Sequence, residues 1–94
     1  MIQPAAECVA LGAAMLDAAM PGWAYRITPG RLDLSCCHSC ILGQLYRGFG
    51  AGVVALGLQG RITEHGFRAT RDVWWDTLLA AWLAEIETRT GARA

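Results

Sequence analysis

The stretch RDVWWDTLLAAWLAEIETR, residues 71–89, decides the fold predicted for this chain. Apolar side chains recur along it at i, i+3, i+4, i+7 and i+11, the spacing of one face of an α-helix. They are Trp75, Leu78, Leu79, Trp82 and Ile86. Thr70 can cap the start, and Asp72 lies near the positive end of the helix dipole. The pattern predicts a final helix over about residues 71–89.

A first helix is predicted over about residues 5–19. Pro4 suits the first turn of a helix, where its missing N–H is no loss, and apolar side chains then recur at helical spacing. Pro21 and Gly22 end the pattern. Residues 23–34 follow as a connection that contains at most a short extended arm over the helices.

A second helix is predicted over about residues 36–47, after Asp33 and Ser35, which are both good N-cap residues. Gly43 lies inside it, and we expect that glycine to mark a close helix–helix crossing. The apolar run 51–58 has the length of a buried strand or of a short buried helix. A short helix is favoured because the chain offers no clear strand partner.

The composition fits a single folded domain over residues 1–94. Apolar residues make up 54% of the chain and charged residues 17%, a balance that disfavours disorder. We therefore expect an all-α fold, a small bundle of the three main helices with a short fourth helix.

The charge balance disfavours nucleic-acid binding. The formal net charge is zero, whereas nucleic-acid binders normally carry a basic excess or stripe. All eight basic side chains are arginine, and alanine and glycine are abundant. This usage indicates a GC-rich coding sequence, and hence a high-GC bacterium or an agent that infects one.

The N-terminal segment does not resemble a signal peptide. It lacks a basic region, and Glu7 and Asp17 bracket its apolar stretch. The longest uncharged run, between Arg47 and Arg61, is far shorter than the ~20 residues of a membrane-spanning helix. We expect a cytoplasmic protein without a membrane segment, in a reducing compartment that disfavours disulfides.

The cluster CCHSC, residues 36–40, is the densest set of metal-capable groups. On a helix, Cys37 and Cys40 would share a face, and Cys36 would lie one turn before Cys40. Such a pair can give two thiolates to zinc, but a closed structural site needs four ligands. The other ligands would come from His38, Cys8 or His65, which form no second recognisable pair.

Two further interpretations of the same cluster remain open. A cysteine at a helix N-terminus has a favoured thiolate, and C-x-x-C places a second thiol nearby, as in redox proteins. Those proteins normally present the motif after a strand, and no βαβ pattern is visible. Ordinary packing is therefore favoured, since free cysteine behaves as a small hydrophobe.

No catalytic set or cofactor motif is recognisable. A pair of Cys40 and His65 can be imagined, but nothing orients it. The carboxylates are scattered, and no phosphate-binding loop occurs. We expect no enzymatic activity, no cofactor and no catalytic residues.

The candidate partner-binding residues are Trp74, Arg71 and Arg68. Trp74 is rotated about 100° from Trp75 around the helix, so both cannot easily face one small core. Tryptophan beside arginine is a typical composition of a binding hot spot. Alternatively, the aromatic residues of the connection, within residues 23–25, cover Trp74.

The segment LDLSCCHSCILGQLY, residues 32–46, resembles a segment of small proteins from actinobacterial phages. Those proteins have a similar Leu-Asp-Leu-Ser lead, a C-x-x-C and then a branched apolar residue before Leu-Gly-Gln-Leu-Tyr. The turn at residues 21–23, the Gly66-Phe67 pair and the tryptophan-bearing final helix are similar too. The family has no assigned activity, so the resemblance implies a context, a phage-encoded protein in a high-GC host, and no functional residues.

These observations favour a non-enzymatic interaction protein that binds a host or phage protein through an apolar, aromatic helical surface. The reason is that the chain has more apolar residues and tryptophans than one small core can hide. Self-association would satisfy the same surface. The alternatives are a small zinc-stabilised regulatory module that uses the Cys36–Cys40 cluster and, second, a thiol redox protein.

Overall fold

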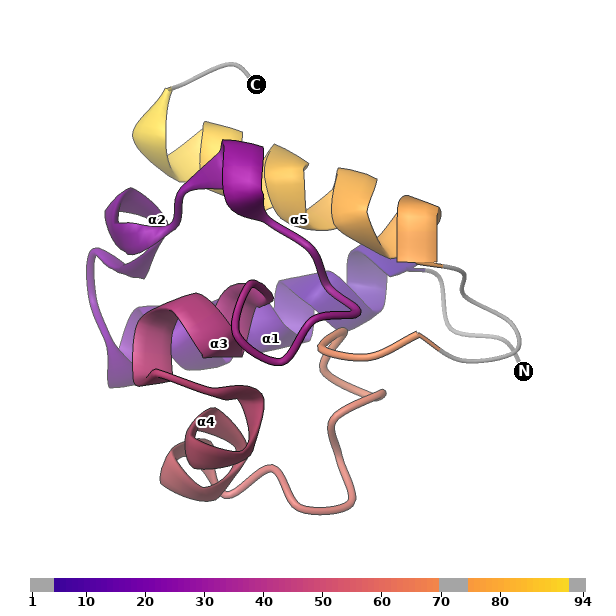
Figure 1. Cartoon of the computed structure of the whole chain (residues 1–94). Coiled ribbons are helices and arrows are strands. Elements are labelled where there is room, and N and C mark those ends of the chain that lie inside the picture. The colour runs from indigo at the N-terminus through magenta and orange to yellow at the C-terminus, as the bar shows by residue number, and fades with distance from the viewer. Residues whose placement is uncertain (1–4, 70–74, 92–94) are drawn as a thin grey trace.

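The computed structural model describes residues 5–69 and 75–91, and its regular elements are all helical (Figure 1). No strand occurs in these residues, which confirms the predicted all-α class. The elements are α1 (Ala5–Ala19), α2 (Trp23–Arg26), the 3-10 turn η1 (Pro29–Arg31), α3 (Ile41–Tyr46), α4 (Phe49–Leu56) and α5 (Trp75–Thr90).

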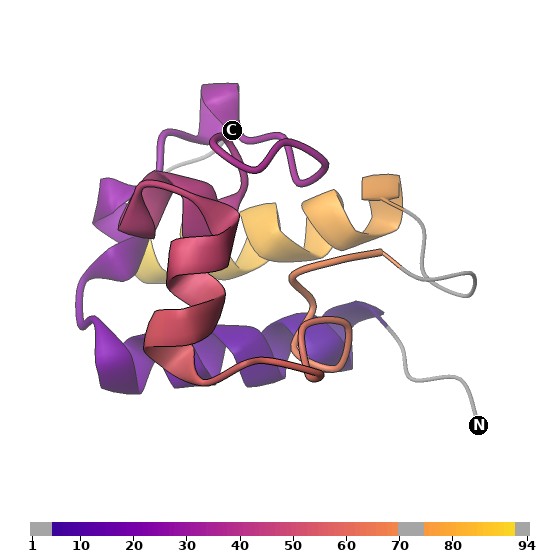
Figure 2. The ribbon, with the colours of Figure 1, turned by 60° about the horizontal axis from the view of Figure 1, so that its bottom comes forward.

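The two long helices, α1 and α5, pack side by side and run in the same direction (Figures 1 and 2). The chain between them packs α3 against α4 and α2 against both α3 and α5. Because α1 and α5 are parallel, their C-terminal ends lie together. None of the helices in the described ranges has the length and apolar character needed to cross a bilayer.

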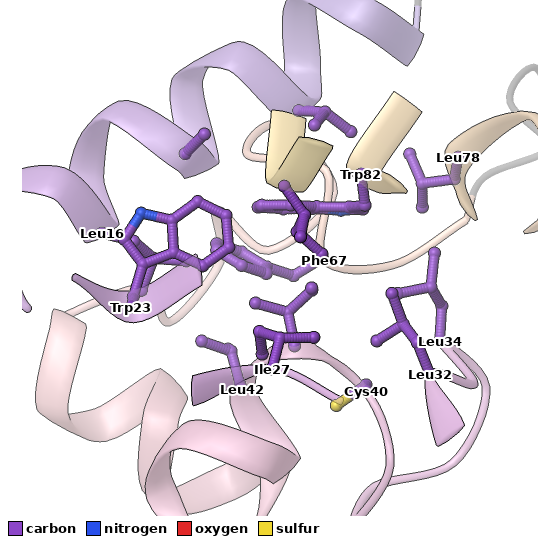
Figure 3. Close-up of a cluster of buried hydrophobic side chains, with 14 of the residues drawn as sticks. Leu16, Trp23, Ile27, Leu32, Leu34, Cys40, Leu42, Phe67, Leu78 and Trp82 are labelled. Carbon is purple, nitrogen blue, oxygen red and sulfur yellow. The ribbon is translucent and has the colours of Figure 1, made fainter. Parts of the chain in front are cut away.

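Tryptophan side chains form the centre of the core (Figure 3). Trp82 of α5 and Trp23 of α2 are fully buried and meet edge to face, with ring centroids 5.8 Å apart. Phe67 stacks on Trp82 at 5.2 Å. The indole N–H of Trp82 donates to the carbonyl oxygen of Gly66 at 2.7 Å, so its burial leaves no unpaired donor.

The predictions for the first and last helices hold in the described residues. The helix over residues 5–19 is confirmed by α1, and α5 confirms the final helix from Trp75 onward. The predicted start of that helix, 71–74, lies outside the described residues. The apolar run near 51–58 is helical, as favoured, with bounds Phe49–Leu56.

The predicted start of the second helix at residue 36 is wrong, because α3 begins at Ile41. The carboxylate of Asp33 accepts hydrogen bonds from both the N–H and the hydroxyl of Ser35, at 3.0 and 2.7 Å. It therefore closes a local turn instead of capping a helix. Further turns carry the chain to Cys40, whose thiol caps α3 by accepting from the Gly43 N–H at 3.2 Å.

Gly43 marks a close approach, but not the predicted helix–helix crossing. A Cβ atom there would lie 2.5 Å from the carbonyl oxygen of Cys37 and 2.8 Å from the Cα of His38. The backbone that closes on α3 is therefore that of the cysteine turn. The connection over 23–34 also differs from prediction, since it contains α2 and η1 instead of an extended arm.

Candidate functional site

Two adjoining pockets flank Trp75 at the start of α5. The larger, about 450 Å³, lies between α5 and the turn that precedes the cysteines, and the smaller measures about 190 Å³. They share Leu34, Ser35 and Trp75, and we call them together the Trp75 groove. The other residues that line it are Leu32, Asp33, Cys36, Cys37, Cys40, Phe49, Phe67, Arg68, Asp76 and Leu79.

The wall opposite α5 is held in place by its own hydrogen bonds. The Asp33 N–H donates to the Ser39 carbonyl at 3.1 Å and closes the turn into a loop. Leu32 and Leu34 are buried on either side of Asp33 and anchor the loop in the core. A wall held by internal contacts of this kind would lose little conformational entropy on binding a partner.

The face of α5 beside the groove is only partly covered. Leu78 and Trp82 are buried, whereas Trp75 and Leu79 of the same predicted stripe remain partly exposed. The sequence pattern assigns Trp75 and Leu79 to the core, and both side chains do pack against it, but the pattern does not show that each is also partly exposed. The width of the apolar stripe is the signal that could have revealed this exposure. The buried residues of α5 are Leu78, Trp82 and Ile86, and they form a narrower stripe than the five apolar residues together.

Of the predicted partner-binding residues, Arg68 lies at the groove. Its side chain is exposed, and its guanidinium carbon is 5.2 Å from the centre of the Phe49 ring. Trp74 and Arg71 lie outside the described residues. The aromatic residues of the connection contact the other end of α5, since the Tyr25 hydroxyl donates to the Arg89 carbonyl at 3.1 Å.

The three clustered cysteines differ in their surroundings. Cys36 is half-buried, and hydrogen bonds from the His38 N–H and from Ser39 lower the pKa of its thiol. Cys40 is buried, and burial raises the pKa of its thiol. Cys37 is exposed. The surroundings of Cys36 thus favour ionisation of its thiol, whereas those of Cys40 oppose it.

The residues proposed for zinc do not come together in the described structure. Over residues 5–69 and 75–91, no group of three or more Cys, His, Asp or Glu side chains is arranged to hold a metal ion. Cys8 is buried on α1, and the His65 ring contacts the Arg61 carbonyl at 3.1 Å. A four-ligand structural zinc site therefore has no second half here.

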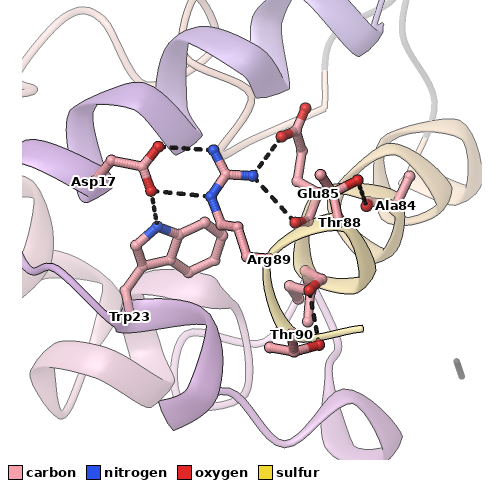
Figure 4. Close-up of polar contacts among 8 residues, drawn as sticks. Asp17, Trp23, Ala84, Glu85, Thr88, Arg89 and Thr90 are labelled. Carbon is pink, nitrogen blue, oxygen red and sulfur yellow. Dashed lines mark hydrogen bonds and ion pairs between the residues drawn. The ribbon is translucent and has the colours of Figure 1, made fainter. Parts of the chain in front are cut away.

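The opposite end of α5 is closed by Arg89 (Figure 4). Its guanidinium donates two hydrogen bonds to Asp17 of α1, at 2.9 and 2.7 Å, and two to Glu85, at 2.6 Å to the carboxylate and 3.1 Å to the carbonyl oxygen. It also lies 5.4 Å from the centre of the Trp23 ring. The Arg89 guanidinium and the Trp23 indole, both donating to Asp17, hold the pKa of that carboxyl below its usual range.

The fold and the groove define a small all-α protein with a groove of mixed apolar and polar lining at one end of its last helix. Comparisons with known protein families, with curated protein sequences and with solved structures find no match to this chain.

Proposed function

We propose that this chain is a phage-encoded, non-enzymatic interaction protein. In this proposal it acts in the cytoplasm of a high-GC bacterial host, where it binds and modulates a host or phage protein. The observation that carries the proposal is the pair of pockets that meet at Trp75, beside the exposed Arg68. A half-exposed tryptophan next to an arginine is the composition of a binding hot spot.

The shape and charge of the groove indicate what it would bind. A pocket of about 450 Å³ lies within the range that encloses small ligands or a few side chains. Asp33 and Asp76 lie at its wall, and neither has a cationic partner within the described residues. A partner segment with one large apolar anchor and an adjacent lysine or arginine fits this pattern.

The test removes the Trp75 side chain from the groove and checks that the protein stays folded. We expect Trp75→Ala to lose the partner captured from an actinobacterial host lysate, while circular dichroism and the melting temperature show a folded domain. Val54→Ser is the matched control, because Val54 of α4 is 69% exposed and lies outside the groove. Retention of the same partner by Trp75→Ala, or its equal loss from Val54→Ser, would contradict the proposal.

A second candidate is a thiol-based sensor, favoured by the lowered pKa of Cys36 in the wall of the smaller pocket. It predicts that Cys36 reacts with iodoacetamide several-fold faster than an unperturbed thiol at neutral pH. Cys36→Ser would remove the fast phase, and Cys37→Ser would keep it. An ordinary alkylation rate in the wild-type protein would eliminate this candidate.

A further inference from the structure

A third pocket, of about 310 Å³, is lined largely by basic residues and shares no residue with the Trp75 groove. Arg26 reaches it from α2, Arg31 from η1 and Arg47 from the end of α3. His38 completes the set with an imidazole from the cysteine turn. Arginines from three separate helical elements therefore line one pocket.

The positive charge of this pocket has no internal partner. No carboxylate lines it, and within the described residues no ion pair or side-chain hydrogen bond involves the three arginines. The whole chain is electrically neutral, so three of its eight arginines at one hollow are a local excess. Guanidinium groups gathered in this way repel one another, and a bound anion would relieve that repulsion.

The walls of the pocket are fixed by Gln44, which lies between them. Its amide oxygen accepts from the Thr28 N–H at 2.7 Å, and its amide nitrogen donates to the Ser39 carbonyl at 3.0 Å. Thr28 lies between Arg26 and Arg31 in the chain, and Ser39 follows His38. The bridge therefore holds the backbone that carries three of the four basic groups, as a preorganised site requires.

Arg47 adopts a backbone conformation that is unfavourable for any residue with a Cβ atom. It ends α3 with φ 66° and ψ 20°, in the left-handed region, and is the one non-glycine residue with positive φ in the described ranges. Glycine or asparagine ordinarily occupies this position at the end of a helix. Arginine occupies this position despite the strain, and it lines the basic pocket.

We propose that this pocket binds a diphosphate group, either free or carried by a small molecule. Guanidinium groups bind phosphate oxygens through paired hydrogen bonds, and the three positive charges match the multiple negative charge of diphosphate. The side chains in the lining are polar, with no apolar wall or aromatic residue other than His38 to hold a base or an acyl chain. A volume of about 310 Å³ is at the small end of ligand pockets.

The experiment is titration calorimetry of the whole chain with sodium diphosphate, inorganic phosphate and a nucleoside diphosphate at physiological salt. We expect diphosphate to bind more tightly than phosphate, and Arg26→Gln or Arg31→Gln to weaken it about tenfold each. Arg61→Gln is the control, because Arg61 is exposed and lies outside the lining. It should stay within about twofold of the wild type.

Two further variants distinguish anion binding from a structural role of the basic residues and from partner binding at the Trp75 groove. Arg47→Gly should weaken diphosphate binding about tenfold while raising the melting temperature, which a purely structural role of Arg47 would not produce. Trp75→Ala should bind diphosphate normally, so this proposal and the partner-binding function fail independently. No binding by the wild type at millimolar diphosphate, equal weakening by Arg61→Gln, or tighter binding of a single-stranded oligonucleotide than of diphosphate would overturn the proposal.

Discussion

The two ends of α5 differ although they belong to one helix with one apolar stripe. At the C-terminal end, Arg89 joins Asp17 and Glu85 and lies over the ring of Trp23. At the N-terminal end, Trp75 is half-exposed between two pockets. The C-terminal end of α5 is therefore held to α1 by hydrogen bonds and an ion pair, and we call it the fastened end. The N-terminal end is available for contact with a partner.

The cause of the difference is the chain that faces each end. The parallel helices α1 and α5 finish together, so two negative dipole ends and Asp17 lie close to one another, and a cation stabilises them. The other end faces the loop around Asp33, whose hydrogen bonds are made within the loop and to Ser39. Pockets remain between this loop and the start of α5.

The largest predicted effect on stability comes from replacing each of two tryptophans of α5 by alanine. We expect Trp82→Ala to lower the free energy of unfolding by about 3–5 kcal/mol, because a fully buried ring and its hydrogen bond are lost. Trp75→Ala, two turns earlier on a half-open surface, should cost about 1 kcal/mol. Urea denaturation measures both, and equal losses would show that Trp75 belongs to the core.

Removing the fastening at the C-terminal end should have the next largest effect. Arg89→Met keeps much of the apolar contact with Trp23 but loses the paired hydrogen bonds to Asp17, and we expect a loss of about 1–2 kcal/mol. Arg68→Met, which removes an exposed arginine over Phe49, should change stability by less than about 0.5 kcal/mol. Equal losses in the free energy of unfolding from the two variants would contradict the difference between the two ends of α5.

The fastened end also predicts a pH dependence. The pKa of Asp17 is lowered in the folded state, so its contribution is complete above its unfolded value of about 3.9 and is lost as the pH falls through the folded value. The melting temperature should therefore drop from about pH 4 downward, and less steeply in Arg89→Met. Asp33, whose pKa Ser35 lowers, adds to the same slope, and Asp33→Asn measures its share.

The last predicted effect concerns neither end of α5 and has the opposite sign. Arg47→Gly relieves the left-handed backbone at the end of α3 and should stabilise the domain by about 0.5–1 kcal/mol. Arg47→Ala, which removes the side chain but keeps the strain, should not stabilise it. A loss of stability in Arg47→Gly would mean that the arginine supports α3.

Much of the helical framework was predictable from local patterns. The Pro21-Gly22 stop and the apolar periodicity predicted the bounds of α1, and the spacing of Leu78, Trp82 and Ile86 identified the buried face of α5. The start of α3 was not predictable, because Asp33 and Ser35 suit a helix cap and an isolated turn equally well. In the structure, the hydrogen bond from the Asp33 N–H to Ser39 and the close approach of Gly43 to the cysteine turn distinguish the two.

The sites depend on contacts that no local pattern contains. Asp17 and Arg89 are 72 residues apart, and Gln44 bridges to Thr28 across 16 residues. Arg26 and Arg31 are close to Asp33 in sequence, which suggests ion pairs. The carboxylate of Asp33 instead accepts from Ser35, and the two arginines line a separate pocket. Of the predicted partner-binding residues, Arg68 does line the groove. The residue shared by both of its pockets, however, is Trp75, which the sequence pattern placed in the core.

The most direct test of the central claim is site-specific photo-crosslinking in the living host. A photoreactive phenylalanine replaces Leu79 at the open end of α5 in one variant and Val54 on α4 in the other. We predict a single heterologous adduct from position 79, lost when Trp75→Ala is added, and no adduct from position 54. The same adduct from both positions, or none from position 79, would contradict the claim that the Trp75 groove is the binding surface.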